Sequence, residues 1–499
     1  MTTIAASADQ RLPFLDGRPK QLLIGGQWAD AASGRTFTTA NPSTGATIAE
    51  IAAADATDVD RAVAAARAAF EGPWSRLTPA QRQGLVWAVA DVVEANFEEL
   101  KFLESVDMGM PIGSAPAAGA EHAVSVLRYF AGFATKLGGD TLPNSMPWEI
   151  LTYTLRSPVG VVASIIPWNS PINNVLWKLA PVLATGCTMV LKPAEEASLV
   201  PLRIGELLAE AGLPDGVVNI VTGPGETVGV ALTEHRDVDK VAFTGSTATG
   251  QAIVRASAGN LKRLTLELGG KSPDVVFADA DLRRAVAGAT MGVFMNSGQA
   301  CTAGTRIFVE RPIYQDFIDA ASEYAQKLTL GDSLDPGTRI GPVVSETQLD
   351  RVTGYLGIGA DEGARAVVGG QRAAGGSLDD GYFVEPTIFV DATDDMRVAT
   401  EEIFGPVACV LPFDTVDEVV QRANATSFGL AGGVWTKDLS KAHTLAHRMK
   451  AGTVWVNTYN LFDPAIPFGG HKMSGWGHEC GPDALDAYLT TKAVWVRTD

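Results

Sequence analysis

The spacing of apolar residues changes along the chain, and each change predicts a different element. Residues 22–50 contain short apolar runs separated by glycine and asparagine, which predicts strands and turns. From Asp58 to Phe97, apolar residues recur at three- and four-residue steps, which is typical of amphipathic helices. A further helix is predicted over 117–137, followed by a strand over 149–156 that could form an arm.

Strand, turn and helix repeat between Val159 and Leu268. The predicted strands are 161–166, 188–192, 217–221 and 240–244, and the predicted helices are 172–184, 201–211 and one from Ser246. This alternation implies right-handed crossovers and a parallel sheet covered on both faces. Ligands of such sheets bind at the carboxyl ends of the strands. Because a second alternating region runs from Asp274 to about Val456, we expect two α/β domains.

Composition and charge narrow the class of protein. A length of 499 residues exceeds what one core usually supports, and 46% hydrophobic with 19% charged residues is typical of a compact globular chain. A formal charge of −18 disfavours nucleic acid and anionic membrane as partners. Residues 1–11 lack the pattern of a secretory signal, and no window is apolar enough for a transmembrane helix, so we expect a cytoplasmic protein.

The candidate nucleophile is Cys301, because the four cysteines Cys187, Cys301, Cys409 and Cys480 show no disulfide or redox spacing. A free thiol is only slightly ionised at neutral pH, so its reactivity depends on its surroundings. Asn169 ends a buried strand and offers an amide that could stabilise an oxyanion, or it could be a turn residue before proline. Glu267 lies in an apolar strand, where burial raises a carboxyl pKa toward that of a general base; a structural pair with lysine is the alternative.

Other strand ends suggest a nucleotide site. Lys192 and Glu195 follow one strand, where a carboxylate can accept from ribose hydroxyls and repel a 2′-phosphate, although such residues are often simply solvated. Neither Gly223–Gly229 nor Gly245–Gly250 matches a dinucleotide or P-loop fingerprint. The second places backbone N–H groups and Ser246 at a helix start, which suits pyrophosphate. The spacing of His471, His478 and Cys480 does not fit a zinc site, so we expect no metal.

Taken together, these segments resemble the aldehyde dehydrogenase superfamily over nearly the whole chain. The matching pieces are Pro167–Asn169, Lys192–Glu195, Phe243–Thr247, Leu266–Lys271, Gly298–Cys301, Glu402–Pro406 and Pro467–Gly470. The resemblance implies a Rossmann-like NAD-binding domain over 1–134 and 157–266, and an α/β catalytic domain over 267–475. It also implies a small β oligomerisation arm over 135–156 and 483–499, which would give a homo-oligomer, a dimer or a tetramer.

The resemblance also implies roles for individual residues. Cys301 would attack an aldehyde, Asn169 and the Cys301 N–H would hold the oxyanion, and Glu267 would activate water to hydrolyse the thioester. Lys178 and Glu479 resemble a proton relay from that base. The cofactor would be NAD, with NADP less favoured but left open because Glu195 can swing aside. The residues expected to bind it are Ile166, Trp168, Lys192, Glu195, Gly225, Phe243, Gly245, Ser246, Leu268, Glu402 and Phe404.

The presumed aldehyde tunnel departs from the family pattern. Ser170 stands where an aromatic residue is common, and Asn173 and Asn174 stand where apolar residues are common, which predicts a wider and more polar entrance. The other expected substrate residues are large and apolar, namely Trp177, Met295, Leu461, Phe462 and Phe468. His478 stands where an arginine is usual before Glu479, so the relay would have a different neighbour in this chain.

The substrate class follows from what the tunnel lacks. No arginine occupies the matched positions, so a second carboxylate would have no bidentate anchor, and we expect a neutral, bulky aldehyde that is aromatic, terpenoid or medium-chain. A cationic aminoaldehyde stays an alternative because aromatic rings can hold one. A CoA-acylating semialdehyde dehydrogenase, a catalytically silent protein of the same fold and a thiol esterase without cofactor are further alternatives.

Overall fold

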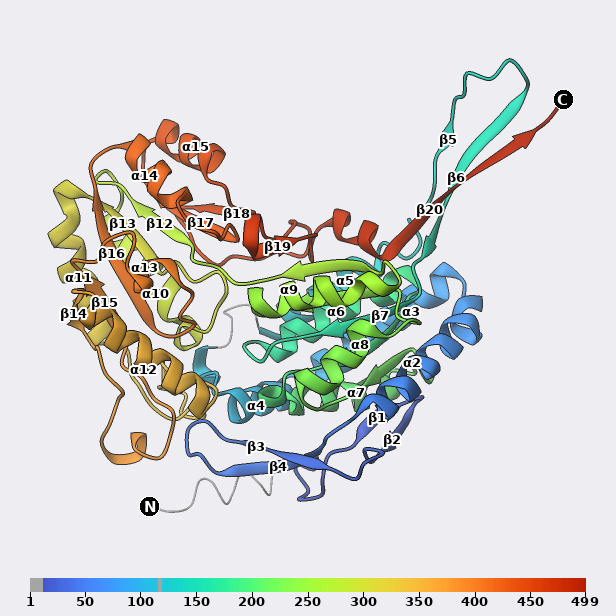
Figure 1. The fold of residues 1–499 in the computed structure, drawn as a ribbon, viewed down its shortest axis with the longest axis horizontal. Coiled ribbons are helices and arrows are strands. Elements are labelled where there is room, and N and C mark those ends of the chain that lie inside the picture. Colours follow the sequence, from blue (N-terminus) through green and yellow to red (C-terminus); the bar gives the residue numbers. More distant parts are fainter. Residues whose placement is uncertain (1–11, 115–118) are drawn as a thin grey trace.

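The computed structural model describes residues 12–114 and 119–499, which form two helix-covered, mainly parallel sheets and a projecting arm (Figure 1). The predicted α/β class is therefore confirmed. The interpretation of residues 1–11 and the start of the helix predicted over 117–137 lie outside the described residues. In the described part of the chain, no helix is both long and apolar enough to cross a membrane.

The first sheet has the strand order β19-β11-β10-β7-β8-β9-β1-β2. Its strands are β1 (Leu22–Ile24), β2 (Gln27–Ala29), β7 (Val161–Ile165), β8 (Thr188–Lys192), β9 (Val218–Ile220), β10 (Lys240–Thr244), β11 (Arg263–Glu267) and β19 (Gly475–Trp476). The chain passes from β7 to β8 and β9 on one side, then returns to β10 and β11 on the other. The strand order thus reverses between β7 and β10, which is where open α/β sheets bind ligands.

Helices cover both faces of this sheet, and its central strands β7 and β8 are buried along their whole length. The helices are α2 (Ala56–Glu71), α3 (Pro79–Ala95), α4 (Phe97–Met108), α5 (Gly119–Ala131), α6 (Pro171–Thr185), α7 (Leu199–Glu210), α8 (Val230–Glu234) and α9 (Thr247–Ala256). Along β7, Val162 packs into the core beneath α3 to α7, whereas Val161 and Ala163 pack into the core beneath α2 and α8. The period of two in the side-chain directions of a strand explains this division.

The periodic run that ends at Phe97 contains a break that the sequence did not reveal. Asn96 ends α3 by donating its side-chain amide to the Val92 carbonyl at 2.8 Å, and α4 begins at Phe97. Two buried carboxylates of α4 then accept from the first turns of other helices. Glu104 accepts from the Ile172 N–H of α6 at 3.2 Å, and Asp107 accepts from the Leu199 N–H of α7 at 2.9 Å. Burial raises the pKa of each to about 7.

The arm is a three-stranded antiparallel sheet that projects from the body and carries the C-terminus near its tip (Figure 1). Its strands are β5 (Thr141–Leu142), β6 (Ile150–Pro158) and β20 (Leu489–Arg497). The strand predicted over 149–156 runs two residues further, because β6 stays paired with β20 up to Pro158 opposite Leu489. Helix α5 ends at Ala131, before the predicted 137, and the chain continues as turns toward the arm.

The second sheet has the order β14-β15-β16-β13-β12-β17-β18 and is parallel except for β14. Its strands are β12 (Pro273–Val276), β13 (Arg306–Glu310), β14 (Arg365–Val368), β15 (Thr387–Val390), β16 (Val407–Phe413), β17 (Ala431–Trp435) and β18 (Thr453–Val456). Its helices are α10 (Leu282–Phe294), α11 (Tyr314–Gln326), α12 (Glu346–Asp361), α13 (Arg397–Thr400), α14 (Val416–Asn424) and α15 (Leu439–Arg448). A separate hairpin pairs β3 (Thr36–Ala40) with β4 (Thr47–Ala52).

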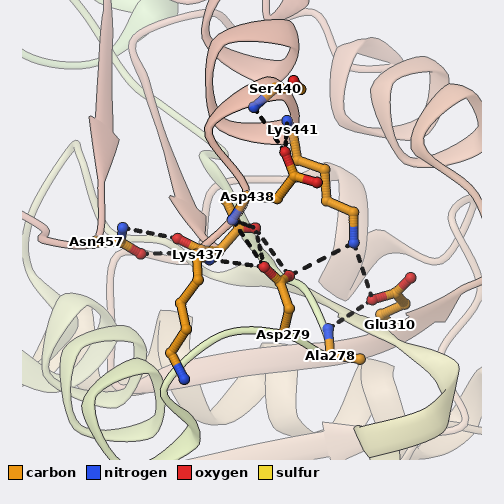
Figure 2. A network of polar contacts seen from close by, with 9 residues as sticks. Ala278, Asp279, Glu310, Lys437, Asp438, Ser440, Lys441 and Asn457 are labelled. Atoms are coloured by element: carbon orange, nitrogen blue, oxygen red, sulfur yellow. Dashed lines mark hydrogen bonds and ion pairs between the residues drawn. The ribbon is translucent and has the colours of Figure 1, made fainter.

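A polar network closes the carboxyl end of the second sheet (Figure 2). Asp279, which follows β12, accepts from the Thr436 hydroxyl at 2.8 Å and from the N–H groups of Lys437 and Asp438 at 2.8 and 2.9 Å. Asp438 in turn caps α15, and the Lys441 ammonium lies 3.6 Å from Asp279. Because Asp279 accepts hydrogen bonds from the turn after β17, it joins the carboxyl ends of β12 and β17.

Candidate active site

The candidate nucleophile follows a loop with an unusual backbone. Asn296, Ser297 and Gly298 have φ of 52°, 56° and 73°, so three successive residues are left-handed. Non-glycine residues in that region are strained and need support from their surroundings. Here the Ser297 hydroxyl donates to the Gly341 carbonyl at 2.8 Å, and a side chain on Gly298 would collide with Gly405. The backbone that leads to Cys301 is thus fixed by two neighbouring loops.

Asn169 and the nucleophile loop are joined directly. The Asn169 amide, after the end of β7, donates to the Gln299 carbonyl at 2.9 Å, and the Asn296 amide donates to the Asn169 carbonyl at 2.7 Å. The Gln299 side chain, fully buried, accepts from the Val344 N–H at 2.9 Å. The predicted oxyanion donor therefore lies beside the cysteine loop. The carbonyl that it contacts belongs to Gln299, two residues before Cys301.

Glu267, the last residue of β11, is 3% exposed and neither of its carboxylate oxygens has a hydrogen-bond partner among the described residues. Burial raises its pKa well above the ordinary value, and the nearby Lys178 opposes the rise. A buried carboxylate without partners is costly, which is typical of a functional group rather than a structural one. Lys178 is itself fully buried in an ion pair with Glu479, and burial lowers its pKa to about 7.

The double glycine explains how these groups come close together. A side-chain carbon on Gly269 would collide with the Glu402 carboxylate, and one on Gly270 would collide with the Cys301 carbonyl. The Gly270 N–H instead donates to Glu402 at 2.8 Å. Only residues without side chains let the segment after β11 pass between the loops that precede β13 and β16. The sequence Leu266–Lys271 is therefore explained by packing as well as by chemistry.

The electrostatic environment keeps Cys301 in its thiol form. Burial raises its pKa to about 12, and the carboxylates of Glu402 and Glu267 add to the rise. Burial also raises the pKa of Glu402. Because the thiolate is the nucleophile, the sulfur needs a proton acceptor or a nearby positive charge in order to react.

The predicted cofactor residues follow the carboxyl ends of the first sheet. Ile166, after β7, donates its N–H to the Lys192 carbonyl of β8 at 3.0 Å. Glu195 accepts from the Lys192 ammonium at 3.2 Å and from the Gly225 N–H at 2.8 Å, and the side chain of Glu195 is 36% exposed. The space beside Gly225 is open. An accessible carboxylate flanked by an ammonium and an open glycine fits the hydroxyl groups of a nucleotide.

The other cofactor candidates gather nearby. The Phe243 ring packs against Gly245, where an added carbon would lie 2.5 Å from the ring, and Leu268 packs against Gly250. Ser246 caps α9 by accepting from the Thr249 N–H at 3.1 Å. Trp168 meets Phe404 edge to face, with ring centroids 5.3 Å apart. This arrangement suits the phosphates and rings of a dinucleotide.

The aromatic residues predicted to contact substrate form one cluster near the nucleophile. The rings of Trp177, Phe462 and Phe468 lie 5.4 to 5.8 Å apart in edge-to-face pairs, and Cys301 packs against the same cluster. Met295 is half-buried. Leu461 is 65% exposed and does not join the cluster.

The polar substrate candidates share a face of α6 with Trp177. Asn173 donates to the Ser170 hydroxyl at 3.2 Å, and Asn174 donates to the Ser170 carbonyl at 2.9 Å. All three are half-buried. Residues at three- and four-residue steps lie on one helix face, so the polar residues continue from the aromatic cluster toward the start of α6.

Four residues that the sequence did not single out support the site. The Ser474 hydroxyl donates to the Gly269 carbonyl at 2.6 Å and accepts from the Gly429 N–H at 3.0 Å. Thr302 donates to Asn460, and the Tyr459 hydroxyl donates to the Thr302 carbonyl at 2.9 Å. Ser474 lies in a stretch that reads only as a glycine-rich loop, and no local pattern marks Tyr459. In residues 12–114 and 119–499, no three or more metal-binding side chains gather in one place.

Comparisons with known proteins agree with this geometry. The model of the aldehyde dehydrogenase family matches residues 28–494. The chain is 46% identical to human mitochondrial aldehyde dehydrogenase, with 99% of this chain and 96% of the relative covered. It is also 46% identical to mitochondrial benzaldehyde dehydrogenase of Antirrhinum majus, with 99% and 92% covered.

Solved structures give the same result. The NAD+ complex of an aldehyde dehydrogenase from Bacillus cereus has a TM-score of 0.95 and 47% identity, with 100% of this chain and 99% of that chain covered. The NAD+ complex of betaine aldehyde dehydrogenase from Staphylococcus aureus has a TM-score of 0.95 and 38% identity, with 97% and 96% covered.

Proposed function

Since the chain belongs to the aldehyde dehydrogenase family and is an NAD-dependent aldehyde dehydrogenase, we propose that Cys301 is its nucleophile and Glu267 its general base. The observation that carries this proposal is the buried, unpartnered Glu267 carboxylate, which lies close enough to Cys301 to raise its pKa. An ionisable side chain kept buried without a partner among the described residues supports a functional role.

In the first half of the reaction, the Cys301 thiol releases its proton to water, and the thiolate sulfur attacks the aldehyde carbon and forms a tetrahedral adduct. The Asn169 amide and the Cys301 N–H donate to the developing oxyanion, which requires Asn169 to turn from the Gln299 carbonyl that it now contacts. One preorganised donor of this kind is worth about 3 to 4 kcal/mol of transition-state stabilisation. NAD, when bound by the residues at the carboxyl ends of the first sheet, supplies the acceptor for the hydride of the adduct.

In the second half, water hydrolyses the thioester on Cys301. Glu267 removes a proton from the water, the hydroxide attacks the thioester carbon, and the carbon–sulfur bond breaks to return the Cys301 thiolate and release the acid. The raised pKa of Glu267 suits this task, because a base whose pKa lies near neutrality combines basicity with availability. Glu267 is then protonated and must lose that proton before the next turnover.

The test of the nucleophile is NADH formation by three forms of the protein: the parent, Cys301→Ala and Cys409→Ala. Cys301→Ala is expected to lower the rate on the order of 10⁴-fold or more, because the covalent route is lost. Cys409→Ala removes a buried thiol from the hydrophobic core between β16 and α12. It is the matched control and should keep the parent rate. Equal loss in both variants, or activity retained in Cys301→Ala, would contradict the proposal.

The substrate proposed is a neutral, bulky aldehyde that is aromatic, terpenoid or medium-chain. Of the eight predicted substrate residues none is charged, and three of them contribute the aromatic cluster beside Cys301. Ser170, Asn173 and Asn174 add a polar stretch that leaves room where larger side chains would stand. The benzaldehyde dehydrogenase among the relatives is in keeping with this class.

A panel of aldehydes tests the substrate class. Benzaldehyde, a terpenoid aldehyde and octanal should show higher kcat/KM than succinic semialdehyde, whose second carboxylate finds no anchoring arginine. Comparable values for succinic semialdehyde would rule the class out. Dependence of turnover on CoA would favour the CoA-acylating alternative.

A cationic aminoaldehyde is the second candidate, and one observation favours it. Burial raises the pKa of the half-buried Tyr129 hydroxyl, and the carboxylates of Asp463 and Asp483 add to the rise. Negative charge therefore lies near the loop that carries Phe462. A cation close to aromatic rings and acidic groups is held by both. Betaine aldehyde in the same panel separates the two classes: a kcat/KM above that of benzaldehyde would make the cationic class the better assignment.

The preference for NAD over NADP is proposed to rest on Glu195, whose carboxylate would repel a 2′-phosphate. Glu195→Ser should raise the kcat/KM ratio of NADP to NAD by about tenfold, which corresponds to about 1.4 kcal/mol. Glu226→Gln, an exposed carboxylate of the same region, is the matched control. An unchanged ratio in Glu195→Ser would assign the preference to another group.

The arm is proposed to join copies of the chain into a dimer or a tetramer. Its strands expose large apolar side chains, with Leu151 at 46% and Trp495 at 57%. Exposed apolar surface of this kind is typical of an interface. Light scattering of the full chain beside Trp495→Lys tests this: the variant should show a lower mass, and equal masses would place the interface elsewhere.

A further inference from the structure

His478 lies where the buried base approaches the surface. Its Nδ1 is 2.8 Å from the position that a side-chain carbon on Gly469 would occupy, and the Glu267 Oε1 is 3.2 Å from the same position. The imidazole is exposed, whereas the Glu267 carboxylate is buried. The two side chains therefore converge on the bare backbone of Gly469, one from solvent and one from the site.

The two atoms are no more than about 6 Å apart, because both lie close to the position of that added carbon, and one water molecule can bridge such a gap. No direct hydrogen bond or ion pair between His478 and Glu267 occurs in the described part of the chain, yet both lie within 3.2 Å of one point. Polar atoms that are close but not in contact are commonly bridged by a single water. Both oxygens of Glu267 are free to take part, since neither has a protein partner among the described residues.

The buried ion pair offers no comparable exit to solvent. Lys178 is fully buried, and Glu479 is 7% exposed. Cys480 is another titratable group near this loop. Burial raises the pKa of its thiol, Glu267 and Asp463 add to the rise, and Lys178 opposes it. Of these groups, His478 is the one that is both exposed and near the Glu267 carboxylate.

We propose that His478 takes the proton of Glu267 through one bridging water and passes it to solvent, which resets the base for the next turnover. The proton that Glu267 removes from the attacking water is carried to His478 Nδ1, while the proton on Nε2 leaves to bulk water. No electrons move, and Glu267 returns to its carboxylate form. An imidazole suits this role because it can accept and donate a proton near neutral pH. This inference rests on the proposed role of Glu267 as general base.

The geometry of the loop directs the imidazole. Ser474 and Gly475 are buried where β19 pairs with the end of β11, and Gly475 lies opposite Glu267 in that pairing. Gly477, with φ of 90°, turns the chain before His478. The same strand pairing thus positions both the base and the residue proposed to reset it.

The experiment compares His478→Ala and His478→Gln with the parent and with His471→Ala, which removes an exposed imidazole from the same loop. NADH formation from benzaldehyde is measured with saturating NAD in weak buffer and then with added imidazole. We expect kcat of both His478 variants to fall about tenfold with unchanged KM, and imidazole to restore it in a concentration-dependent way. His471→Ala should behave as the parent does.

Two outcomes would overturn the inference: an unchanged kcat in both His478 variants, or a loss that imidazole does not restore. Glu267→Gln separates this failure from failure of the proposed function. If Glu267→Gln is inactive and not rescued while the His478 variants are normal, only the exit route is wrong. If Glu267→Gln still hydrolyses the thioester, the proposed base itself is wrong.

Discussion

The two large sheets of this enzyme contribute opposite ends of their strands to the candidate site. In the first sheet, the proposed cofactor residues follow the carboxyl ends of β7, β8, β10 and β11. In the second sheet, the carboxyl end is closed by the Asp279 network (Figure 2), and the site lies at the amino ends of the strands. There the loops before β12, β13 and β16 carry Gly270, Cys301 and Glu402.

The connection between the sheets explains the difference. Five residues join the end of β11 at Glu267 to the start of β12 at Pro273, so the second sheet begins where the first one ends (Figure 1). The carboxyl end of one sheet therefore faces the amino end of the other, and the candidate site occupies the junction. The rule that ligands bind at carboxyl ends describes the sheet that binds the nucleotide, and it does not extend to the sheet that supplies the nucleophile.

After Cys301→Ala, the largest expected effect comes from changing the base at this junction. Glu267→Gln should lower kcat by about 10²- to 10⁴-fold, because the amide cannot remove a proton from water. The free energy of unfolding should stay the same or rise, since a buried group without partners is replaced by a neutral one. Steady-state NADH formation and thermal denaturation measure the two quantities, and loss of folding in place of loss of rate would contradict the assignment.

The parent enzyme adds a pH test of the same residue. Because the folded-state pKa of Glu267 is raised well above its ordinary value, hydrolysis of the thioester should increase as pH rises through that pKa. The hydride step does not need this base. The rate of acid release should therefore increase with pH through the pKa of Glu267. The rate of single-turnover NADH formation should not show this increase.

A smaller effect is expected from the buried carboxylates of α4 behind the first sheet. The pKa values of Glu104 and Asp107 are raised to about 7, so the folded chain keeps protons that the unfolded chain loses above about pH 4 to 4.5. Their contribution to stability is fully present below that pH and is lost as pH rises through about 7. Glu104→Gln, which keeps an acceptor for Ile172, should flatten the fall in melting temperature between pH 5 and 8, and an unchanged slope would exclude Glu104 as its source.

The smallest effect is expected at the closed end of the second sheet. Asp279→Asn should lower the free energy of unfolding by about 1 to 2 kcal/mol, because the amide accepts the N–H groups of Lys437 and Asp438 less well. Its kcat should match that of the parent, in contrast to Glu267→Gln. Denaturant unfolding and NADH formation measure both, and a large loss of kcat would mean that the two ends of the sheet are coupled.

Much of this arrangement could be predicted from the sequence. The strands of the first sheet are short apolar runs bounded by glycine and proline, so their positions followed from periodicity. The break between α3 and α4 could not be predicted, because Asn96 interrupts a pattern that continues through it. Likewise, β19 is too short to show any alternation and exists only because it pairs with β11.

The candidate site shows the same limit. Cys301, Glu267 and Asn169 were named from residue type and position, and their convergence depends on tertiary contacts that no local pattern contains. Ser474 and the left-handed backbone of Asn296 and Ser297 were missed, since both depend on loops far away in the chain. The roles of these residues stay predictions that the variants above can test.

The segment between β11 and β12 also has a mechanical meaning. Gly269 and Gly270 are confined between Glu402 and Cys301, so this five-residue segment has little room to adjust when one sheet rotates relative to the other. A small movement of the first sheet on cofactor binding would thus displace the Glu267 carboxylate relative to the Cys301 sulfur. The segment between β11 and β12 would act as a short, stiff connection between the two sheets.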